Sequence, residues 1–212
     1  MQARAAQRWA AFLERKDKAM ENIKLEKPYI FEGQEYTEIE TSKLETMTVQ
    51  DAIDAQAKVS DQMAAVIVPE SSTAYQMELA AKATQMPVEF YKNMPVPIAT
   101  ALRNVFLALF ADAADKDEGT VLKLKQPYKY KGKTYTEVDM SGAATLNAMD
   151  MSDAENRMAA LGQIAYEPSR NYLYCCIMAA KSSGLDVEFF TGLPISEALH
   201  IKNALTSNRF FG

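Results

Sequence analysis

The chain contains an internal repeat, and this repeat limits the possible fold more than any other feature of the sequence. The segment from Lys24 to Ile39 recurs, with many identical or similar residues, from Lys123 to Val138. Pro127 lies 99 residues after Pro28, and the same offset aligns the rest of the two copies without a gap. Self-similarity at a fixed spacing is typical of one structural unit used more than once. We therefore expect two tandem modules of one fold.

The aligned positions share side-chain character along both copies. Asp51, Asp54 and Ala55 superpose on Asp150, Asp153 and Ala154; Val88-Glu89-Phe90-Tyr91 superposes on Val187-Glu188-Phe189-Phe190; and Met94-Pro95-Val96 superposes on Leu193-Pro194-Ile195. The alternative is that two unrelated domains share only a hairpin motif. A duplication explains the sequence better, because polar, aromatic and proline positions all keep the same offset along both copies.

Each copy opens with the pattern of a β-hairpin. Large and polar residues alternate on either side of Gly33 in the first copy and of Gly132 in the second. Glycine at such a turn supplies a positive φ at low cost. Pro28 and Pro127 stand near the strand starts, where a missing N–H is tolerated.

After each hairpin the apolar period changes from two to that of a helix. In the first copy we expect helices over residues 48–63, 72–85 and 97–111, with Thr48 and Asp51 as a capping pair. In the second copy we expect them over residues 152–166, 169–183 and 196–206, with Ser152 and Glu155 as the capping pair. The predicted fold is α+β, with two tandem ββααα modules.

The segments outside the repeat complete the expected organisation. An amphipathic N-terminal helix over residues 1–23 precedes a first module over residues 24–111, a charged linker over residues 112–122 and a second module over residues 123–212. The N-terminal helix either packs on the first module or reaches for a partner.

Composition and charge exclude several classes of function. The net charge is −5 and the pI is near 5.1, which argues against nucleic acid and anionic membranes as partners. The longest apolar run, Val105 to Ala111, is too short for a membrane span. We expect an intracellular protein without a membrane partner.

The residue types needed for catalysis or metal binding are sparse. His200 is the only histidine, and we expect it to be an exposed helix residue. Cys175 and Cys176 are adjacent in an apolar stretch, which favours buried thiols over a redox pair. The paired carboxylates near the helix starts favour capping over acid–base catalysis. We therefore expect no catalytic residues, no metal and no cofactor, and a protein that is not an enzyme.

The two hairpins differ in charge. The second carries Lys129, Lys131 and Lys133, whereas the first carries Glu32 and Glu35. Opposite charges on equivalent surfaces would steer one hairpin toward another, within or between chains. A basic ribbon with tyrosines also suits nucleic acid, and simple solvation of the lysines is a third interpretation.

Aromatic residues gather near the end of each module. These aromatic residues are Phe90, Tyr91, Phe189, Phe190, Phe210 and Phe211. Together with Lys129, Lys131 and Lys133 of the second hairpin, they are the candidate protein-binding residues. Core packing explains these aromatic positions equally well.

Several of these motifs resemble one known family. The aromatic hairpin ending in Tyr-Thr-Glu, the Asp-Ala helix, the segment Leu185 to Pro194 and the closing Asn208 to Gly212 are similar to the tail assembly chaperones of Mu-like and P2-like phages. This resemblance implies a protein that coats the helical tape-measure protein, recruits tail-tube subunits and then leaves. It also implies self-association, action in the cytoplasm of the infected host and absence from the mature virion.

Other functions stay open at this point. The chain could instead be a structural tail or baseplate subunit, or an adaptor or inhibitor that binds a host protein. The family is also known for frameshifted longer products, and Phe210-Phe211-Gly212 is compatible with a U-rich slippery sequence in the gene.

Overall fold

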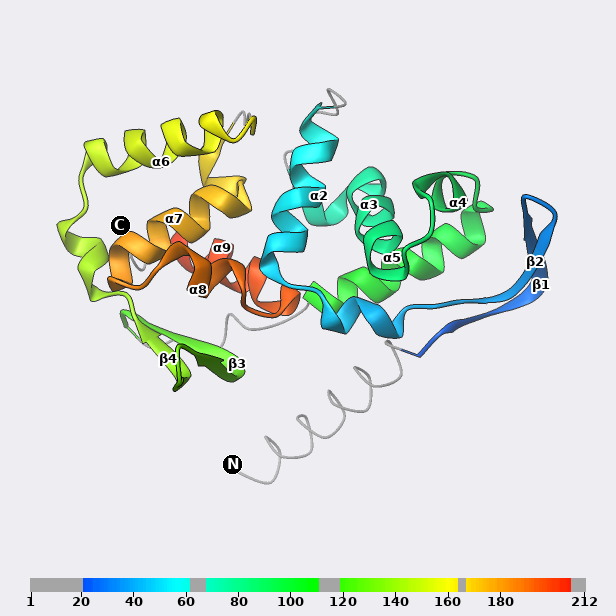
Figure 1. Cartoon of the computed structure of the whole chain (residues 1–212), viewed down its shortest axis with the longest axis horizontal. Helices are drawn as coiled ribbons and strands as arrows, with labels where there is room; N and C mark the ends of the chain where they lie inside the picture. Colours follow the sequence, from blue (N-terminus) through cyan, green and yellow to red (C-terminus); the bar gives the residue numbers. More distant parts are fainter. Residues whose placement is uncertain (1–20, 62–67, 111–118, 164–166, 207–212) are drawn as a thin grey trace.

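A computed structural model describes residues 21–61, 68–110, 119–163 and 167–206. It has mixed α+β architecture, in which helices make up the body and two separate antiparallel hairpins lie at its edges (Figure 1). The predicted N-terminal helix falls almost entirely outside the described residues.

The first half of the chain (residues 21–110) begins with its hairpin. Its elements are β1 (Ile23–Phe31), β2 (Gln34–Ile39), the 3-10 helix η1 (Ser42–Thr46), α2 (Val49–Asp61), η2 (Pro69–Ser71), α3 (Thr73–Thr84), α4 (Val88–Lys92) and α5 (Val96–Phe110).

The second half (residues 119–206) follows a closely similar order. Its elements are β3 (Val121–Tyr130), β4 (Lys133–Asp139), η3 (Ser141–Thr145), α6 (Ala148–Ala160), η4 (Pro168–Arg170), α7 (Tyr172–Ser183), α8 (Val187–Thr191), η5 (Ile195–Glu197) and α9 (Ala198–Thr206).

Both predicted hairpins form, but Pro28 and Pro127 lie inside β1 and β3, where the pairing register is irregular, and not at the strand starts. Tyr29 pairs with Tyr36 across the first ladder, and Tyr128 pairs with Tyr135 across the second. Gly33 and Gly132 both have φ of +80° at the turns, a conformation that a side chain strains. Because the pairing register is the same in both hairpins, the two tyrosine pairs lie on the same face and at the same distance from the turn.

Three details of the predicted elements are wrong. The Val-Glu-Phe-aromatic segment is a short helix, α4 or α8, so each half has four α-helices in place of three. Helix α6 begins at Ala148, and its capping box is Asn147 with Asp150 in place of Ser152 with Glu155. Strand β3 begins at Val121, within the stretch predicted to be linker.

Several other helix ends are capped by nearby residues, and the predicted pair of Thr48 and Asp51 is one of them. Ser72 accepts a hydrogen bond from the N–H of Tyr75 at the start of α3. Gly184 ends α7 in the left-handed conformation, with φ of +70°. The carboxylate of Asp51 accepts from the N–H of Thr48 at 2.7 Å and closes the start of α2. These interactions satisfy backbone groups that the helices leave without partners.

Helix α2 joins the two halves. It packs on α3 of its own half and also contacts α7, α8 and η5 of the second half, and in Figure 1 it stands in the middle of the molecule between these helices. Just before α2, the N–H of Val49 donates to the carbonyl of Leu193 at 2.8 Å, and the N–H of Ile195 donates to the carbonyl of Met47 at 2.9 Å.

Among the described residues, no helix is long and apolar enough to cross a membrane. The apolar side chains instead form one continuous core that includes residues of both halves.

Candidate protein-binding surfaces

A cluster of aromatic rings holds each hairpin against its own half. The Phe90 ring contacts Tyr29, Phe31 and Tyr36 at centroid distances of 5.1, 5.3 and 4.8 Å. The hydroxyl of Tyr29 also donates to the carbonyl of Phe90 at 2.8 Å. Edge-on aromatic contacts of this kind add to the stability gained by burial.

The second half repeats this aromatic cluster. Phe189 contacts Tyr128, Tyr130 and Tyr135 at 5.4, 5.4 and 4.9 Å. Phe189 and Phe190 are fully buried, and Phe90 and Tyr91 are only 3% and 2% exposed. These four candidate binding residues lie in the core, so a direct contact with a partner would require the hairpins to move. Their binding role stays a prediction.

The three candidate lysines lie on the exposed second hairpin. Lys131 pairs with the carboxylate of Asp186 at 2.6 Å, and this ion pair lowers the pKa of the Asp186 carboxyl. The Lys133 ammonium lies 4.6 Å from the ring centre of Tyr135. Lys129 is exposed opposite Thr134. The remaining candidates, Phe210 and Phe211, lie outside the described residues.

A groove of about 480 Å³ runs between α2 and α3. Its apolar lining comes from Ala55, Ala81, Met86 and Val88. Its charged lining residues form ion pairs from α2 to α3, Lys58 with Glu78 at 3.4 Å and Lys82 with Asp54 at 2.5 Å. An apolar lining beside charges of both signs suits the side chains of an amphipathic helix. The sequence patterns did not reveal this groove, because its lining comes from α2, α3, the segment after α3 and the start of α4, which meet only in the folded chain.

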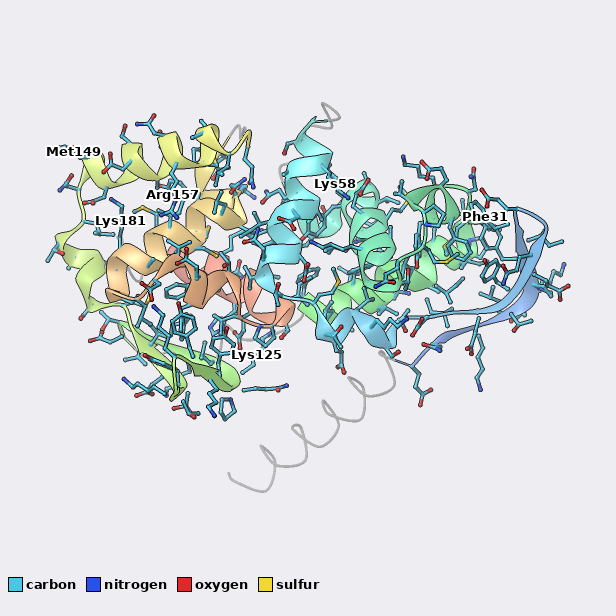
Figure 2. The ribbon with its side chains drawn as sticks, in the orientation of Figure 1. Phe31, Lys58, Lys125, Met149, Arg157 and Lys181 are labelled. Carbon is cyan, nitrogen blue, oxygen red and sulfur yellow. The ribbon has the colours of Figure 1, made fainter. Side chains whose placement is uncertain are left out.

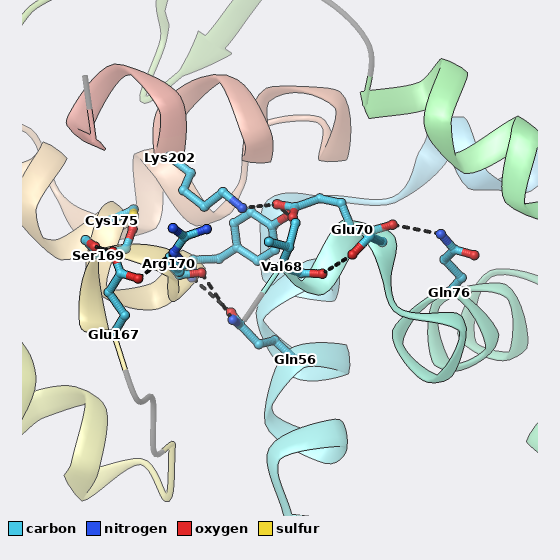
Figure 3. Close-up of polar contacts among 11 residues, drawn as sticks. Gln56, Val68, Glu70, Gln76, Glu167, Ser169, Arg170, Cys175 and Lys202 are labelled. Carbon is cyan, nitrogen blue, oxygen red and sulfur yellow. Dashed lines mark hydrogen bonds and ion pairs between the residues drawn. The ribbon is translucent and has the colours of Figure 1, made fainter. Parts of the chain in front are cut away.

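A buried polar junction connects the halves at Gln56 of α2. Its side-chain oxygen accepts from the N–H of Tyr172 at 2.9 Å, and its amide nitrogen donates to the carbonyl of Arg170 at 3.3 Å (Figure 3). Gln56 is only 7% exposed. A side chain of the first half therefore hydrogen-bonds buried backbone groups at the start of α7 in the second half.

Glu70 extends the same junction. Its carboxylate accepts hydrogen bonds from the Tyr172 hydroxyl and from the Lys202 ammonium, which comes from α9 (Figure 3). All three side chains are buried. Burial is the main cause that raises the pKa of Tyr172 well above its usual value, and the nearby Tyr75 and Glu70 add to it. Tyr172 therefore stays a neutral donor.

His200 differs from its prediction. It is 3% exposed, and its Nδ1 lies 2.9 Å from the carboxylate of Glu197. The expectation of an exposed helix residue was wrong, because α9 packs against α7 and η4. Cys175 and Cys176 are buried, as predicted, and burial raises the pKa of the Cys175 thiol to about 12. A thiol with such a pKa is a poor nucleophile near neutral pH.

The repeated carboxylates cap helices and hold the adjacent helix. Burial works against the ionisation of Asp51, but hydrogen bonds from Lys82 and Thr48 outweigh it and lower the pKa of its carboxyl. Lys181 and the N–H of Asn147 lower the pKa of Asp150 in the same way. Among the described residues, no three His, Cys, Asp or Glu side chains lie together as metal ligands would.

The conspicuous surfaces of this mixed α+β chain are the groove between α2 and α3 and the charged second hairpin. Residues 22–110 match the family described as phage tail assembly chaperone proteins, E, or 41 or 14. Over this stretch the chain is therefore similar to phage tail assembly chaperones, a family whose members are typically not enzymes. No curated protein and no solved structure matches the chain.

Proposed function

We propose that this chain is a non-enzymatic chaperone that binds the tape-measure protein and recruits tail-tube subunits during tail assembly. The observation that carries the proposal is the family match over residues 22–110, which covers nearly the whole first half. A long helix with exposed apolar stripes aggregates unless another surface covers those stripes. A chaperone of this kind would act in the host cytoplasm and leave before the virion is complete.

We also infer that the second half is a second copy of the same module. Its hairpin register, its aromatic cluster and the carboxylate cap of its first α-helix all have counterparts at the offset of the sequence repeat. Two linked binding units raise the effective concentration at the second contact, so that weak contacts along one long helix add up. The duplication therefore suits an elongated partner.

The groove between α2 and α3 is the surface that we assign to the tape-measure helix. Ala55 and Ala81 form a floor of small side chains, and Met86 adds a flexible apolar one. A helix with an apolar stripe would place that stripe on the floor and its flanking charges on the rim. The exposed Lys129, Lys131 and Lys133 would steer an acidic partner toward the second hairpin.

Co-expression with the tape-measure protein tests the proposal. We expect the wild-type chain to keep that protein in the soluble fraction and to co-purify with it. The change Val88→Asp places a charge at the groove, and we expect it to reduce recovery. Ile30→Asp, at an exposed apolar residue of the first hairpin that does not line the groove, is the control and should leave recovery unchanged. An insoluble tape-measure protein without any bound chain would contradict the proposal.

Mass spectrometry of purified virions tests whether the chain leaves. We expect it to be absent from finished particles. Abundant copies in the virion would favour a structural tail subunit instead.

A further inference from the structure

The residues that line the groove between α2 and α3 have counterparts in the second half at the repeat offset of 99 residues. All but one of them keep their identity or their chemical character. The exception is Glu78, which is replaced by Ile177 in the second half. The matching pairs are Asp54 with Asp153, Ala55 with Ala154, Lys58 with Arg157, Ala81 with Ala180, Lys82 with Lys181, Met86 with Leu185 and Val88 with Val187.

Glu78 is buried although it is an acidic residue. It is only 7% exposed, and Ile177 is 3% exposed at the equivalent position. A carboxylate that is removed from water needs positive charges and hydrogen bonds in place of the water, whereas an isoleucine does not. The groove thus holds a carboxylate at a position where the same fold accepts an apolar side chain.

The described residues satisfy only part of the Glu78 carboxylate. Its Oε2 lies 3.4 Å from the ammonium of Lys58. The Lys58 side chain is 60% exposed, so water screens this ion pair. Oε1 of Glu78 accepts no hydrogen bond from the described residues, and it is not fully enclosed by them. This oxygen is therefore still accessible to a group that enters the groove.

Pairing with Lys58 does not by itself explain the presence of Glu78. The second half keeps a basic residue, Arg157, at the position of Lys58, although Ile177 replaces the acid there. Figure 2 shows Lys58 on α2 beside α3, and Arg157 on α6 beside α7. The basic residue thus occurs with or without an acidic neighbour, so the carboxylate is the feature that is special to the first half.

The other lysine of the groove is already neutralised. Lys82 pairs with Asp51 at 2.8 Å and with Asp54 at 2.5 Å. Two carboxylates share this one ammonium, which leaves it unable to compensate Glu78 as well. A further positive charge for Glu78 would therefore come from a bound partner.

We propose that the groove selects a helix that carries a lysine or an arginine within its apolar stripe, and that Glu78 binds the positive charge of this residue. The proposal rests on the part of the proposed function that places a partner helix in the groove. The aliphatic stem of such a residue would pack on Met86 and Val88, while its charged end reaches the carboxylate.

The two halves then differ in the helix residue that they favour. Ile177 has no charge to offer, so the second half does not share the preference for a basic residue. A partner helix that contacts both halves would be held in the register that brings its basic residue to Glu78. Such a difference between two otherwise similar modules gives binding a direction along the partner.

Helical peptides test the preference. Three amphipathic peptides of about 20 residues have the same sequence except for the central residue of the apolar stripe, which is lysine, norleucine or glutamate. Calorimetric titration measures their affinity for the wild-type chain. We expect the lysine peptide to bind about tenfold more tightly than the norleucine peptide, and the glutamate peptide to bind most weakly. Equal affinities of the lysine and norleucine peptides, or no binding of any peptide, would overturn the proposal.

Variants assign the preference to Glu78. Glu78→Ile introduces the residue of the second half and should make the norleucine peptide the tighter ligand. Lys58→Met removes the competing ammonium and should increase the affinity for the lysine peptide; a Glu78 that serves only as the partner of Lys58 predicts no such gain. Glu89→Gln removes an exposed carboxylate outside the groove and should keep the wild-type preference. Circular dichroism would verify that each variant is folded.

This test and the co-expression experiment fail separately. If the tape-measure protein co-purifies but the peptides show no preference, the proposed function stands and the specificity of the groove is wrong. If the peptides show the preference but the tape-measure protein does not co-purify, the specificity stands and the proposed function is wrong.

Discussion

The carboxylate of Glu70 and the hydroxyl of Tyr172 are hydrogen-bonded in the interior although 102 residues separate them in the chain. Glu70 belongs to η2 of the first half, and Tyr172 begins α7 of the second. Lys202 binds the same carboxylate from α9. The halves thus share one buried polar network, in which Oε1 of Glu70 receives its hydrogen bonds from the second half.

Removal of the Lys202 ammonium should destabilise the protein strongly. The change Lys202→Met leaves the Glu70 carboxylate buried without its positive partner, which typically costs about 3–5 kcal/mol. Urea unfolding would measure the loss. The double change Glu70→Gln with Lys202→Met should be less destabilised than Lys202→Met alone, because it removes the buried charge. An equal loss in both variants would show that the ammonium acts only through packing.

Gln56 should contribute more to the stability of the protein than the other glutamine of α2, Gln50. The change Gln56→Ala leaves the Tyr172 N–H and the Arg170 carbonyl without their partner, and we expect a loss of about 1–3 kcal/mol in the free energy of unfolding. Gln50→Ala, on the exposed side of the same helix, is the control and should change stability by about 0.5 kcal/mol or less. Similar losses for both variants would contradict the assigned junction.

Gly142 should not tolerate a side chain. A Cβ at this position would lie 2.3 Å from the carbonyl oxygen of Ser182, and backbone atoms cannot yield cheaply. We expect Gly142→Ala to cost about 1–3 kcal/mol through overpacking. Thermal unfolding measures this cost. Ala144→Ser, at an exposed position of the same 3-10 helix, should leave the melting temperature nearly unchanged.

Stability should fall in acid, in part through Asp51. The folded state lowers the pKa of this carboxyl below its usual value of 3.8. A lowered pKa stabilises the folded protein above the unfolded pKa, and this contribution is lost as the pH falls through the folded pKa. Between pH 6 and pH 3 the wild type should therefore lose more stability than Asp51→Asn does. Glu137→Gln, an exposed comparison, should keep the wild-type dependence.

The hairpins and most helix ends could be predicted from local sequence. Gly33 and Gly132 mark turns whose positive φ belongs to the residue itself, and Ser72 and Gly184 mark caps whose partners lie within a few residues. The cap of α6 could also be predicted from the repeat, because Asn147 and Asp150 are the equivalents of Thr48 and Asp51 at the repeat offset. The nearer pair Ser152 and Glu155 fits the same pattern, but both residues lie inside α6.

The sequence by itself determined the repeat, the two hairpins and the order of the three longer helices in each half, because these depend on residue type and on spacing within a few turns of chain. Only the tertiary structure decided that α2 is buried on both sides while α6 is exposed on one, that His200 lies in the interior and that Gln56 and Glu70 join the halves. The two copies of the repeat have the same local preferences for strand and helix. The burial of each copy differs, because it depends on which distant surface packs against that copy.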